Sequence, residues 1–430
     1  MSKALRIGVA GLGTVGRGVV KVLQQNGDVI AARAGRRIEI VAVSARQRTN
    51  DRGVDLSSYR WYDDAAAMAA DPDLDAVVEL IGGADGVARR IAETALQNGK
   101  ALVTANKALI AHHGMALAAL AEEKKAPIRL DAAVAGGIPI IKAISDGLAA
   151  NRCTAVFGIL NGTCNYILTQ MEQTGRSFAD ILADAQRLGY AEADPSFDVD
   201  GIDAAHKLAI LSAVAFGAKL AFEAISITGI RDVTPVDMKY ADEFGYRIKL
   251  LGIARYGAAG LEQRVEPCLV RKSNPLAAVG DVFNAVVVEG DFVGRTVYEG
   301  RGAGEGPTAS AVVADLVDVA RGNRTPVFSI PVRQLTAPQA VARGALVASF
   351  YLHLRVLDEP GVIAAISESL RDQEISIENL VQRGEAADGG IDVILTTHET
   401  REDKLIAAVD KIASLRTVLS RPVAMRMIRA

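Results

Sequence analysis

The N-terminus places a glycine cluster between an apolar, β-rich run at residues 5–10 and an amphipathic helical pattern at residues 15–23. The cluster is Gly11-Leu12-Gly13-Thr14-Val15-Gly16. Its first glycine allows a tight turn, its second lets the backbone approach a pyrophosphate, and its third lets helix and strand pack closely. The phosphates of a dinucleotide then lie over the helix N-terminus. A chain with 40 glycines can also produce this spacing by chance, so a structural turn stays the alternative.

Further apolar runs continue this alternation of strands and helices. Strand-like runs at residues 38–43, 76–80 and 100–104 are separated by turn residues and by a helical pattern at residues 87–97. Strands that alternate with helices form βαβ units around a mainly parallel sheet. We therefore predict an α/β fold in which residues 1–138 form a Rossmann-type nucleotide-binding domain.

The pattern changes between about residues 140 and 300. Helical periods at residues 178–188 and 202–214 mix with a strand-like run at residues 285–289, which predicts an α+β catalytic and dimerisation domain over residues 139–306. A second glycine-rich loop, residues 300–306, precedes a helical stretch at residues 308–321. We expect that helix, within about residues 307–325, to pack back on the nucleotide-binding domain and complete it.

The last part of the chain forms a compact pattern of its own. Residues 330–348 contain two prolines and little periodicity, which predicts a linker. Beyond it we expect strand 350–357, helix 361–371, strand 375–382, a glycine-rich turn at 384–390, strand 391–397, helix 401–413 and strand 422–428. The order βαββαβ is the ferredoxin-like layout, predicted here for residues 349–430.

Composition narrows the class of protein. The net charge of −3 leaves no electrostatic footprint for nucleic acid or an anionic membrane. Cys153, Cys164 and Cys268 stand at wide spacings that match neither a disulfide framework nor a zinc motif, which favours a reducing compartment. The N-terminus lacks the apolar stretch that a signal peptide or membrane span needs. We expect a cytoplasmic protein that acts on small molecules.

The residues after the second strand-like run bear on the choice of dinucleotide. A site specific for NAD places an acid there to bond the ribose hydroxyls, whereas this chain has Ser44, Arg46 and Arg48. Arginine suits the 2′-phosphate of NADP. We expect NADP, with Arg46 as a candidate contact, and keep NAD and a merely solvated pair of arginines as alternatives.

The richest polar stretch lies between residues 189 and 207. Asp203 and Lys207 are four residues apart in a helical pattern, so their side chains share one face. A lysine held beside an aspartate can be positioned to give or take a proton, although a solvated ion pair would have the same spacing. Glu192, in the loop before this helix, could capture a substrate ammonium. The acidic loop could also bind a divalent metal, but no histidine accompanies it at ligand spacing.

Two more segments carry candidate ligands. Thr104 ends the fourth strand-like run and Lys107 follows it, and in an open α/β sheet the carboxyl ends of the strands form the binding crevice. Residues 131–139 are mostly small, and their backbone carbonyls could converge on a ligand or an ion. A close-packed hinge between domains is the alternative for that segment.

Together these segments resemble the homoserine dehydrogenase family. The matching motifs follow the family's order over about 320 residues: GLGTVG, TANKALIA, AAVAGGIPIIK, GILNGTCNYIL, LGYAEADPSFDVDGIDAAHK and GAGEGPTASAVVADL. The resemblance implies NAD(P)-linked interconversion of L-homoserine and L-aspartate 4-semialdehyde, on the route to threonine, methionine and isoleucine. It also implies a homodimer or homotetramer.

The resemblance assigns roles to individual residues. Lys207 would be the acid/base residue, with Lys107 as the second candidate for proton transfer. Asp203 would orient Lys207 or hold the substrate, Glu192 would bind the substrate amino group, and Asp198 is a further candidate substrate contact. The candidate cofactor contacts are Gly11, Gly13, Thr14, Val15, Gly16, Arg46, Thr104, Lys107, Gly189 and Gly304.

The family also implies a structural monovalent cation, taken to be Na⁺, held by one carboxylate and several backbone carbonyls. The matching positions here are Asp131, Val134, Gly136 and Ile138. Asp131 replaces the usual glutamate and is one methylene shorter, although an aspartate is still a hard oxygen ligand. The contact therefore depends on whether the shorter side chain of Asp131 still reaches the cation.

The C-terminal unit resembles an ACT domain. Leu357-Asp358-Glu359-Pro360-Gly361-Val362 matches that family's strand-to-helix turn, where a free amino acid commonly binds. The resemblance implies feedback inhibition by L-threonine. Proline and glycine beside a helix start are also ordinary turn chemistry, so an ACT fold that only mediates subunit contact is the alternative.

Two rival functions remain. The chain could be a dehydrogenase of another small amino-acid semialdehyde, or a non-catalytic sensor of a nucleotide and an amino acid. A sensor has no need of a paired acid/base lysine, so the presence of Lys107, Glu192, Asp203 and Lys207 together favours an enzyme.

Overall fold

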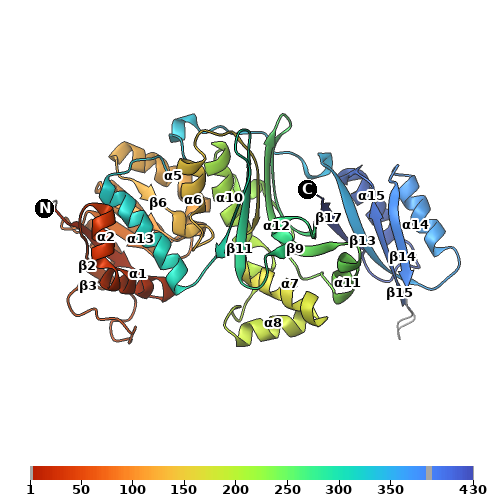
Figure 1. The fold of residues 1–430 in the computed structure, drawn as a ribbon, viewed down its shortest axis with the longest axis horizontal. Coiled ribbons are helices and arrows are strands. Elements are labelled where there is room, and N and C mark those ends of the chain that lie inside the picture. Colours follow the sequence, from red (N-terminus) through yellow and green to blue (C-terminus); the bar gives the residue numbers. More distant parts are fainter. Residues whose placement is uncertain (1–2, 384–389, 430) are drawn as a thin grey trace.

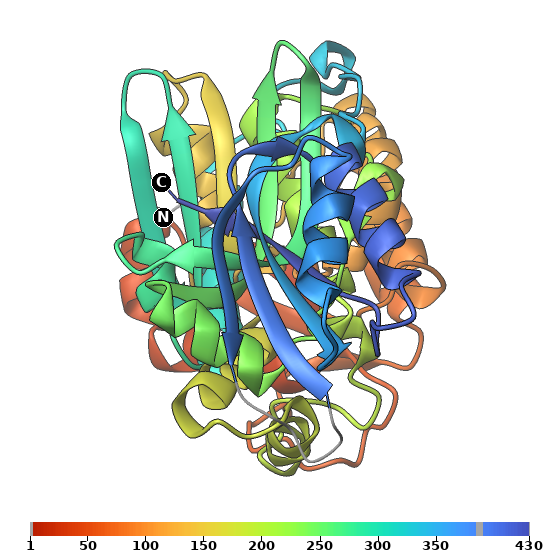
Figure 2. The same cartoon turned by 90° about the vertical axis from the view of Figure 1, so that its right-hand side faces the viewer.

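The structure is a computed structural model that describes residues 3–383 and 390–429. The chain forms three units in a row, with the N-terminal unit at one end and the C-terminal unit at the other (Figure 1). Figure 2 looks at the C-terminal unit end-on. The glycine-rich turn expected at residues 384–390 lies outside the described residues except for Gly390. No helix in the described ranges is both long and apolar enough to cross a membrane.

A six-stranded parallel sheet organises the N-terminal unit. Its strand order, β3-β2-β1-β4-β5-β6, is that of a Rossmann fold and confirms the predicted fold class. The strands are β1 Leu5–Ala10, β2 Ile38–Ser44, β3 Arg60–Tyr62, β4 Ala76–Glu79, β5 Ala101–Thr104 and β6 Ile128–Arg129. The helices of this unit are α1 Thr14–Gln25, α2 Gly27–Ala34, α3 Ala65–Ala70, α4 Val87–Gln97, α5 Lys107–Lys124 and α13 Glu305–Arg321.

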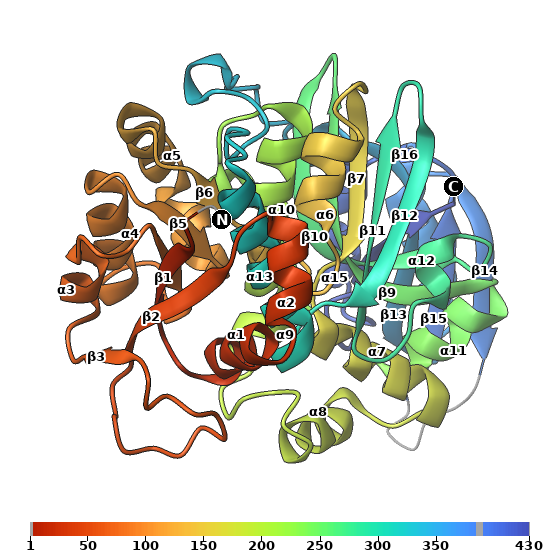
Figure 3. The ribbon, with the colours of Figure 1, turned by 60° about the vertical axis from the view of Figure 1, so that its left-hand side comes forward.

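Different helices cover the two faces of this sheet (Figure 3). On one face, Ile7 and Val9 of β1 pack with Val19 of α1 and Val312 of α13. The other face packs against α3 and α4. The helix α13 comes from far along the chain and begins three residues before the predicted position 308. Its contact with α1 places the loop before it, residues 302–304 of the predicted loop 300–306, beside the glycine cluster.

The central unit is built on antiparallel strands in the order β12-β11-β7-β9-β10. The helices α7 and α10 pack on this sheet. The strands are β7 Cys153–Ile159, β9 Tyr246–Gly257, β10 Gly260–Arg271, β11 Phe283–Gly290 and β12 Gly294–Arg301, with a short β8 Ser226–Ile227 beside β10. The helices are α6 Ile140–Lys142, α7 Gly162–Thr174, α8 Phe178–Arg187, α9 Ser196–Val199, α10 Ile202–Phe216, α11 Pro235–Glu243 and α12 Pro275–Ala278, with short turns η1 Asp131–Ala133, η2 Ala143–Gly147 and η3 Phe222–Ala224.

The C-terminal unit has the predicted βαββαβ order. Its strands lie in the order β17-β13-β15-β14, which is the ferredoxin-like arrangement, and α14 and α15 pack against each other beside them. The elements are β13 Val347–Leu357, α14 Val362–Arg371, β14 Ile377–Arg383, β15 Gly390–Thr397, α15 Glu402–Ala413 and β17 Val423–Ile428, with a two-residue strand β16 Thr400–Arg401. Strand β13 begins three residues before the predicted position 350.

One 11-stranded sheet joins the central and C-terminal units, which the sequence did not predict. Strand β17 pairs in parallel with β10, with Cys268 opposite Arg426 and Val270 opposite Ile428. On its other side β17 pairs antiparallel with β13. Main-chain hydrogen bonds therefore hold the C-terminal unit against the central sheet.

The segment predicted as a linker, residues 330–348, lies along the central sheet. It contains two short 3₁₀ turns, η4 Val332–Gln334 and η5 Arg343–Ala345. Leu261 of β10 donates its N–H to Gln339 O at 2.9 Å, and Val341 donates its N–H to Leu261 O at 3.0 Å. These bonds attach the segment to β10.

Buried polar contacts also hold the junction. The ring of His353 in β13 lies between two carboxylates, with Nδ1 2.8 Å from Asp237 of α11 and Nε2 3.1 Å from Asp392 of β15. Burial favours the neutral ring, but the hydrogen bonds and charges of the two carboxylates outweigh it and raise the pKa of His353. Tyr351 donates its hydroxyl to Asp237 at 2.8 Å.

Candidate active site

The helix α10 lies at the centre of the candidate site. Nearly all of its residues are buried, because it packs between α5 of the N-terminal unit and strands β7 and β9. A helix that is apolar all round belongs in a core. Asp203 and Lys207, in its first two turns, are therefore buried charges that need partners inside the protein.

The carboxylate of Asp203 joins the two predicted lysines. Lys207 Nζ lies 2.7 Å from Asp203 Oδ2, and Lys107 Nζ lies 3.1 Å from Asp203 Oδ1. Lys207 also donates to the carbonyl oxygen of Leu160 at 2.7 Å. Lys107 begins α5 directly after β5, so the N-terminal and central units meet at this carboxylate. The structure rules out the alternative of a solvated ion pair on an exposed helix.

A third polar side chain, Asn161, fixes the carboxylates. Its amide nitrogen lies 2.8 Å from both Asp203 Oδ2 and Asp198 Oδ1. Its amide oxygen accepts the N–H of Cys164 at 2.8 Å, which makes Asn161 the N-cap of α7. The bond to Cys164 fixes the Asn161 side chain at the start of α7, and its amide nitrogen therefore fixes the carboxylates of Asp198 and Asp203.

The lysines and carboxylates of the site shift one another's pKa. Burial alone would raise the pKa of Asp203, but Lys207 and Lys107 outweigh it and hold that pKa well below its usual range. Burial would lower the pKa of Lys107, but the charge of Asp203 outweighs it and raises that pKa. Burial raises the pKa of Asp198. At neutral pH the site therefore contains an ionised Asp203 and a protonated Lys107.

Lys107 lies on the open side of the cluster. Its side chain is 34% exposed, against 10% for Lys207. Its ammonium lies 5.6 Å from the ring centre of Phe197, within the range of a cation–π contact. Glu192 is exposed in the loop before α9, and its charge contributes to the raised pKa of Lys107. The structure thus brings Glu192, Asp203 and both lysines to one site.

The glycine cluster has the backbone that a dinucleotide needs. Gly11 has a φ of +98°, and a Cβ on Gly16 would lie 1.9 Å from Gly11 O. At Gly13, by contrast, a Cβ would meet no atom within 4 Å. The first turn of α1, at Thr14, contains no acidic residue, and no described side chain caps it. The start of α1 therefore offers open space, N–H groups without a partner and the positive end of the helix dipole. An anionic pyrophosphate fits such a helix start.

Of the other predicted cofactor positions, Gly304 lies beside this loop, and Arg46 and Thr104 lie at the carboxyl ends of β2 and β5. Gly304 is the N-cap of α13, and the next residue, Glu305, pairs with Arg17 and Lys21 of α1 at 2.5 and 2.7 Å. Arg46 is exposed just after β2, and Gly189 is exposed after α8 with a φ of +76°. Thr104 is fully buried and donates its hydroxyl to Glu79 of β4 at 2.7 Å.

Comparison with known proteins shows the family. A family description "Homoserine dehydrogenase" matches residues 139–317, and "Homoserine dehydrogenase, NAD binding domain" matches residues 11–131. The chain is 46% identical to a homoserine dehydrogenase of Pseudomonas aeruginosa over 423 residues, with 97% of each chain covered. A crystal structure of a homoserine dehydrogenase from Thiobacillus denitrificans has a TM-score of 0.93 at 45% identity, and covers 99% of this chain and 98% of its own. The chain belongs to the homoserine dehydrogenase family.

Membership of this family confirms the predicted enzyme class. The match to the NAD-binding domain begins at Gly11 and so includes the whole glycine cluster. The match to the catalytic domain contains Asp203 and Lys207. The chain is therefore an oxidoreductase of the homoserine dehydrogenase family with a NAD-type nucleotide-binding domain. A shorter relative, an archaeal homoserine dehydrogenase with 25% identity and a TM-score of 0.64, covers 74% of this chain and 97% of its own.

The replacement Gly16→Ala is expected to weaken dinucleotide binding by at least ~10-fold. The added methyl would lie 1.9 Å from Gly11 O, so the backbone of the glycine cluster must move. Titration of NADP, followed by fluorescence, measures the dissociation constant. Gly27→Ala is the matched control, because a Cβ at Gly27 meets no atom within 4 Å. Equal affinity in the two variants would contradict the proposed role of the loop.

The predicted cation positions fall in one buried turn. Asp131 Oδ1 accepts the N–H groups of Ile141 and Lys142 at 3.0 and 3.3 Å, and Asp131 donates its own N–H to Asp315 at 2.9 Å. Burial and the nearby Asp315 raise the pKa of Asp131. Val134, Gly136 and Ile138 are also buried. Among the described residues no group of three or more His, Cys, Asp or Glu side chains could hold a metal ion. The predicted cation, which relies on carbonyls, stays a prediction.

A histidine pair that no sequence pattern indicated lies beside Lys207. His206 Nε2 lies 3.1 Å from His112 Nε2 of α5, and the His206 ring stacks on Phe222 with 4.4 Å between centroids. Burial lowers the pKa of His206 to about 4, so its ring is neutral at pH 7. The pair forms a second contact between α5 and α10. Two histidines 94 residues apart leave no local pattern, whereas Asn161 had one as a helix-capping residue.

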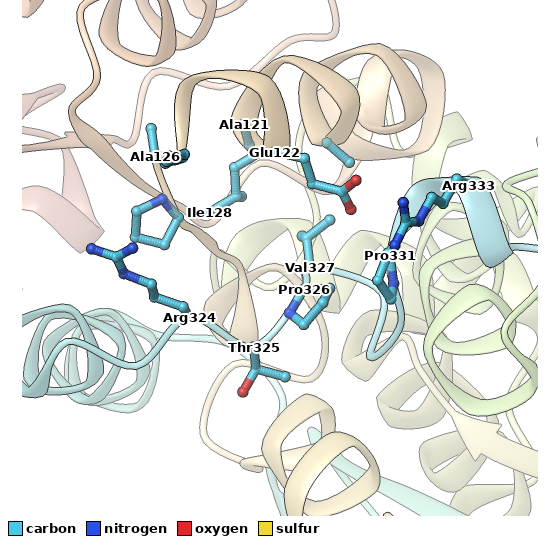
Figure 4. Close-up of a pocket in the computed structure, with 13 residues that line it drawn as sticks. Ala121, Glu122, Ala126, Ile128, Arg324, Thr325, Pro326, Val327, Pro331 and Arg333 are labelled. Carbon is cyan, nitrogen blue, oxygen red and sulfur yellow. The ribbon is translucent and has the colours of Figure 1, made fainter.

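A separate cavity of about 380 Å³ lies at the other end of α5 (Figure 4). It is bordered by the last turn of α5, by β6 and by residues 324–333. Its charged side chains, including Glu122, Arg324 and Arg333, are exposed. None of the predicted site residues lines it, so it is not part of the candidate active site.

Proposed function

We propose that this chain interconverts L-homoserine and L-aspartate 4-semialdehyde with NADP, and that Lys207 moves the proton. The observation that carries this proposal is the convergence of Lys207 and Lys107 on one buried carboxylate, Asp203, at the carboxyl end of the nucleotide-type sheet. A dinucleotide bound over the glycine cluster supplies the hydride acceptor. Threonine, methionine and isoleucine synthesis is the pathway that the family implies.

Lys207 is suited to exchange a proton with the substrate hydroxyl. Its amine is fixed by Asp203 and by Leu160 O, and a lysine has three N–H groups, so one can face a substrate oxygen. In oxidation the neutral amine takes the hydroxyl proton, and Asp203 stabilises the ammonium that forms. In reduction the ammonium returns that proton to the developing alkoxide.

Lys107 is the second candidate, with a different expected task. Lys107 is the more exposed of the two lysines, and Asp203 raises its pKa, so its amine stays protonated at neutral pH. A permanent ammonium can instead hold the substrate oxygen or carboxylate. Glu192 lies on the same open side and suits the substrate ammonium, while Asp198 is held nearby by Asn161.

NADP is the proposed dinucleotide, with NAD as the second possibility. Arg46 is exposed just after β2, where a 2′-phosphate would lie in a Rossmann fold. The archaeal relative described above was solved in complex with NADPH.

The replacement Arg46→Gln is expected to raise the KM for NADP by about 10-fold or more, because a charge-assisted bond to phosphate contributes ~1.5–3 kcal/mol. The KM for NAD should change little. Steady-state kinetics with both cofactors measure this selectivity. Arg48→Gln is the control, since the Arg48 guanidinium lies 5.9 Å from the Trp61 ring centre. A loss of NADP selectivity in Arg48→Gln alone would contradict the assignment.

We further propose a monovalent cation, Na⁺, at Asp131 and the carbonyls of Val134, Gly136 and Ile138, and feedback inhibition by L-threonine through the C-terminal unit. The ferredoxin-like order of the C-terminal unit supports inhibition by threonine, since ACT domains share this layout. The buried turn around Asp131 supports the cation site. A homodimer or homotetramer is the expected assembly.

The experiment that tests the proposed function is a direct assay. Purified protein is mixed with L-homoserine and NADP at alkaline pH, and absorbance is followed at 340 nm. We expect an increase with homoserine and a smaller one, or none, with L-serine, which lacks one methylene. No increase with either nicotinamide cofactor would overturn the proposal and favour a non-catalytic sensor.

A further inference from the structure

One buried amide in the central unit has no hydrogen-bond partner. Asn284 of β11 is only 1% exposed, and neither its side-chain oxygen nor its side-chain nitrogen makes a hydrogen bond within the described part of the chain. Among the buried side chains of the described ranges, it is the only one with two such atoms. A buried amide without partners costs free energy. Its donor and acceptor therefore point to a state of the protein in which both are paired.

On one side Asn284 lies beside the catalytic segment. A Cβ on Gly162, the first residue of α7, would lie 3.5 Å from Asn284 Oδ1. Gly162 directly follows Leu160 and Asn161, whose carbonyl oxygen and side-chain amide bond Lys207 Nζ and the carboxylates of the site. The amide of Asn284 is therefore next to the residues that fix the proposed proton-transfer group.

On the other side the amide lies against the loop before α13, residues 302–304. A Cβ on Gly302 would lie 2.2 Å from Asn284 Oδ1 and 2.4 Å from its Nδ2, so only a glycine lets this backbone come so close. Within the described ranges, neither the N–H nor the carbonyl oxygen of Gly302 makes a hydrogen bond. An unpaired amide and an unpaired peptide therefore lie side by side without a bond between them.

We propose that Asn284 is a positioning residue for the dinucleotide. When the dinucleotide binds, a small rotation of the loop lets the amide bond the N–H and carbonyl groups of Gly302. The loop is then fixed between the glycine cluster and the catalytic segment. Gly302 and Gly304 have no side chain to resist the rotation, and Gly304 already has a φ of +124°. Because these bonds form only in the bound state, they favour that state over the free one.

The variant Asn284→Val separates positioning from stability. Valine suits a strand and removes both unpaired atoms, so the melting temperature of the free protein should stay equal or rise. The dissociation constant for NADP should rise at least ~5-fold, because two amide hydrogen bonds of the bound state are lost. The kcat at saturating NADP should fall less than about threefold, since Asn284 touches no reacting atom. Thermal unfolding with and without NADP, a fluorescence titration and steady-state kinetics measure these quantities.

Ser349→Ala is the matched control for Asn284→Val. The Ser349 hydroxyl is also buried without a partner in the described part of the chain, but it lies on β13 of the C-terminal unit. Its removal should not lower the melting temperature, and it should leave the dissociation constant for NADP unchanged. A change in NADP affinity as large as in Asn284→Val would show that the loss does not come from the loop.

A second variant covers the case in which valine is too large for the site. Asn284→Ala cannot clash with Gly302 and should show the same loss of NADP affinity. Unchanged affinity in both variants, with an active wild type, would overturn the inference, because the amide would then serve the stability of the free protein alone. The inference rests on the proposed dehydrogenase function. If the wild type bound neither NADP nor NAD, the proposed function would fail and this inference with it.

Discussion

Replacing Lys207 by methionine is expected to lower the kcat for homoserine oxidation by at least ~100-fold, the lower end of what general acid–base catalysis contributes. Methionine keeps the length and apolar stem of the side chain but cannot carry a proton. The glycine cluster lies in another unit, so the dissociation constant for NADP should change less than about threefold. Steady-state kinetics and a fluorescence titration of NADP measure the two quantities on one preparation.

Lys107→Met is the matched comparison for Lys207→Met. Lys107 shares Asp203 but is more exposed, and its raised pKa suits a residue that holds the substrate. We expect its KM for homoserine to rise more than its kcat falls. The opposite outcome would be a large loss of kcat in Lys107→Met and a kcat within about threefold of wild type in Lys207→Met. Less than ~1 kcal/mol of the barrier would then depend on Lys207, and its assignment as the proton-transfer residue would be wrong.

The second large effect is expected from Asp203→Asn. Removing this buried carboxylate leaves Lys207 without its ionic partner in the core, and breaking a buried pair in this way costs about 3–5 kcal/mol. The figure belongs at the lower end here, because Lys107 is partly exposed and can turn to water. The kcat for homoserine oxidation should fall as well, because the Asp203 carboxylate no longer fixes the position of Lys207 Nζ. Urea denaturation measures the free energy of unfolding.

The pH dependence of stability gives a second readout for Asp203. Its pKa is lower in the folded chain than its ordinary value of 3.8, so its contribution to stability is complete above that value. That contribution is lost as the pH falls below 3.8 towards the folded pKa. Asp203→Asn should therefore flatten the acid side of the stability curve.

Asp200→Asn is the control for Asp203→Asn. Asp200 is a neighbouring aspartate whose partner, Arg231, is exposed. Surface pairs of this kind contribute at most about 1 kcal/mol. If Asp200→Asn lost as much stability as Asp203→Asn, the buried bridge from Asp203 to the lysines would not be the cause of the destabilisation.

Local patterns predicted the parts of the fold that depend on neighbouring residues. The alternation of apolar runs and turns at residues 5–104 was enough to predict a parallel Rossmann sheet, and the spacing of Asp203 and Lys207 placed them on one helix face. The βαββαβ order was visible for the same reason. Each of these features is determined within a few turns of the chain, where periodicity and turn residues act.

The remaining features depend on contacts between distant segments. The bridge from Lys107 to Asp203 joins two units, and no pattern along the chain shows that α5 meets α10. Asn161 had a visible role as a helix cap, but its second role beside Asp198 and Asp203 requires the packed structure. The pairing of β17 with β10 was equally hidden, because a strand's sequence does not show which sheet edge it will join.

The most direct test of proton transfer by Lys207 is a crystal structure of the enzyme with NADP and L-homoserine, in which the distances from the substrate hydroxyl to both lysines are measured. We predict that Lys207 Nζ lies within hydrogen-bond range of that oxygen, about 2.6–3.2 Å, with the substrate ammonium near Glu192. A hydroxyl bonded to Lys107 Nζ, with Lys207 Nζ still turned to Leu160 O and out of reach, would contradict it.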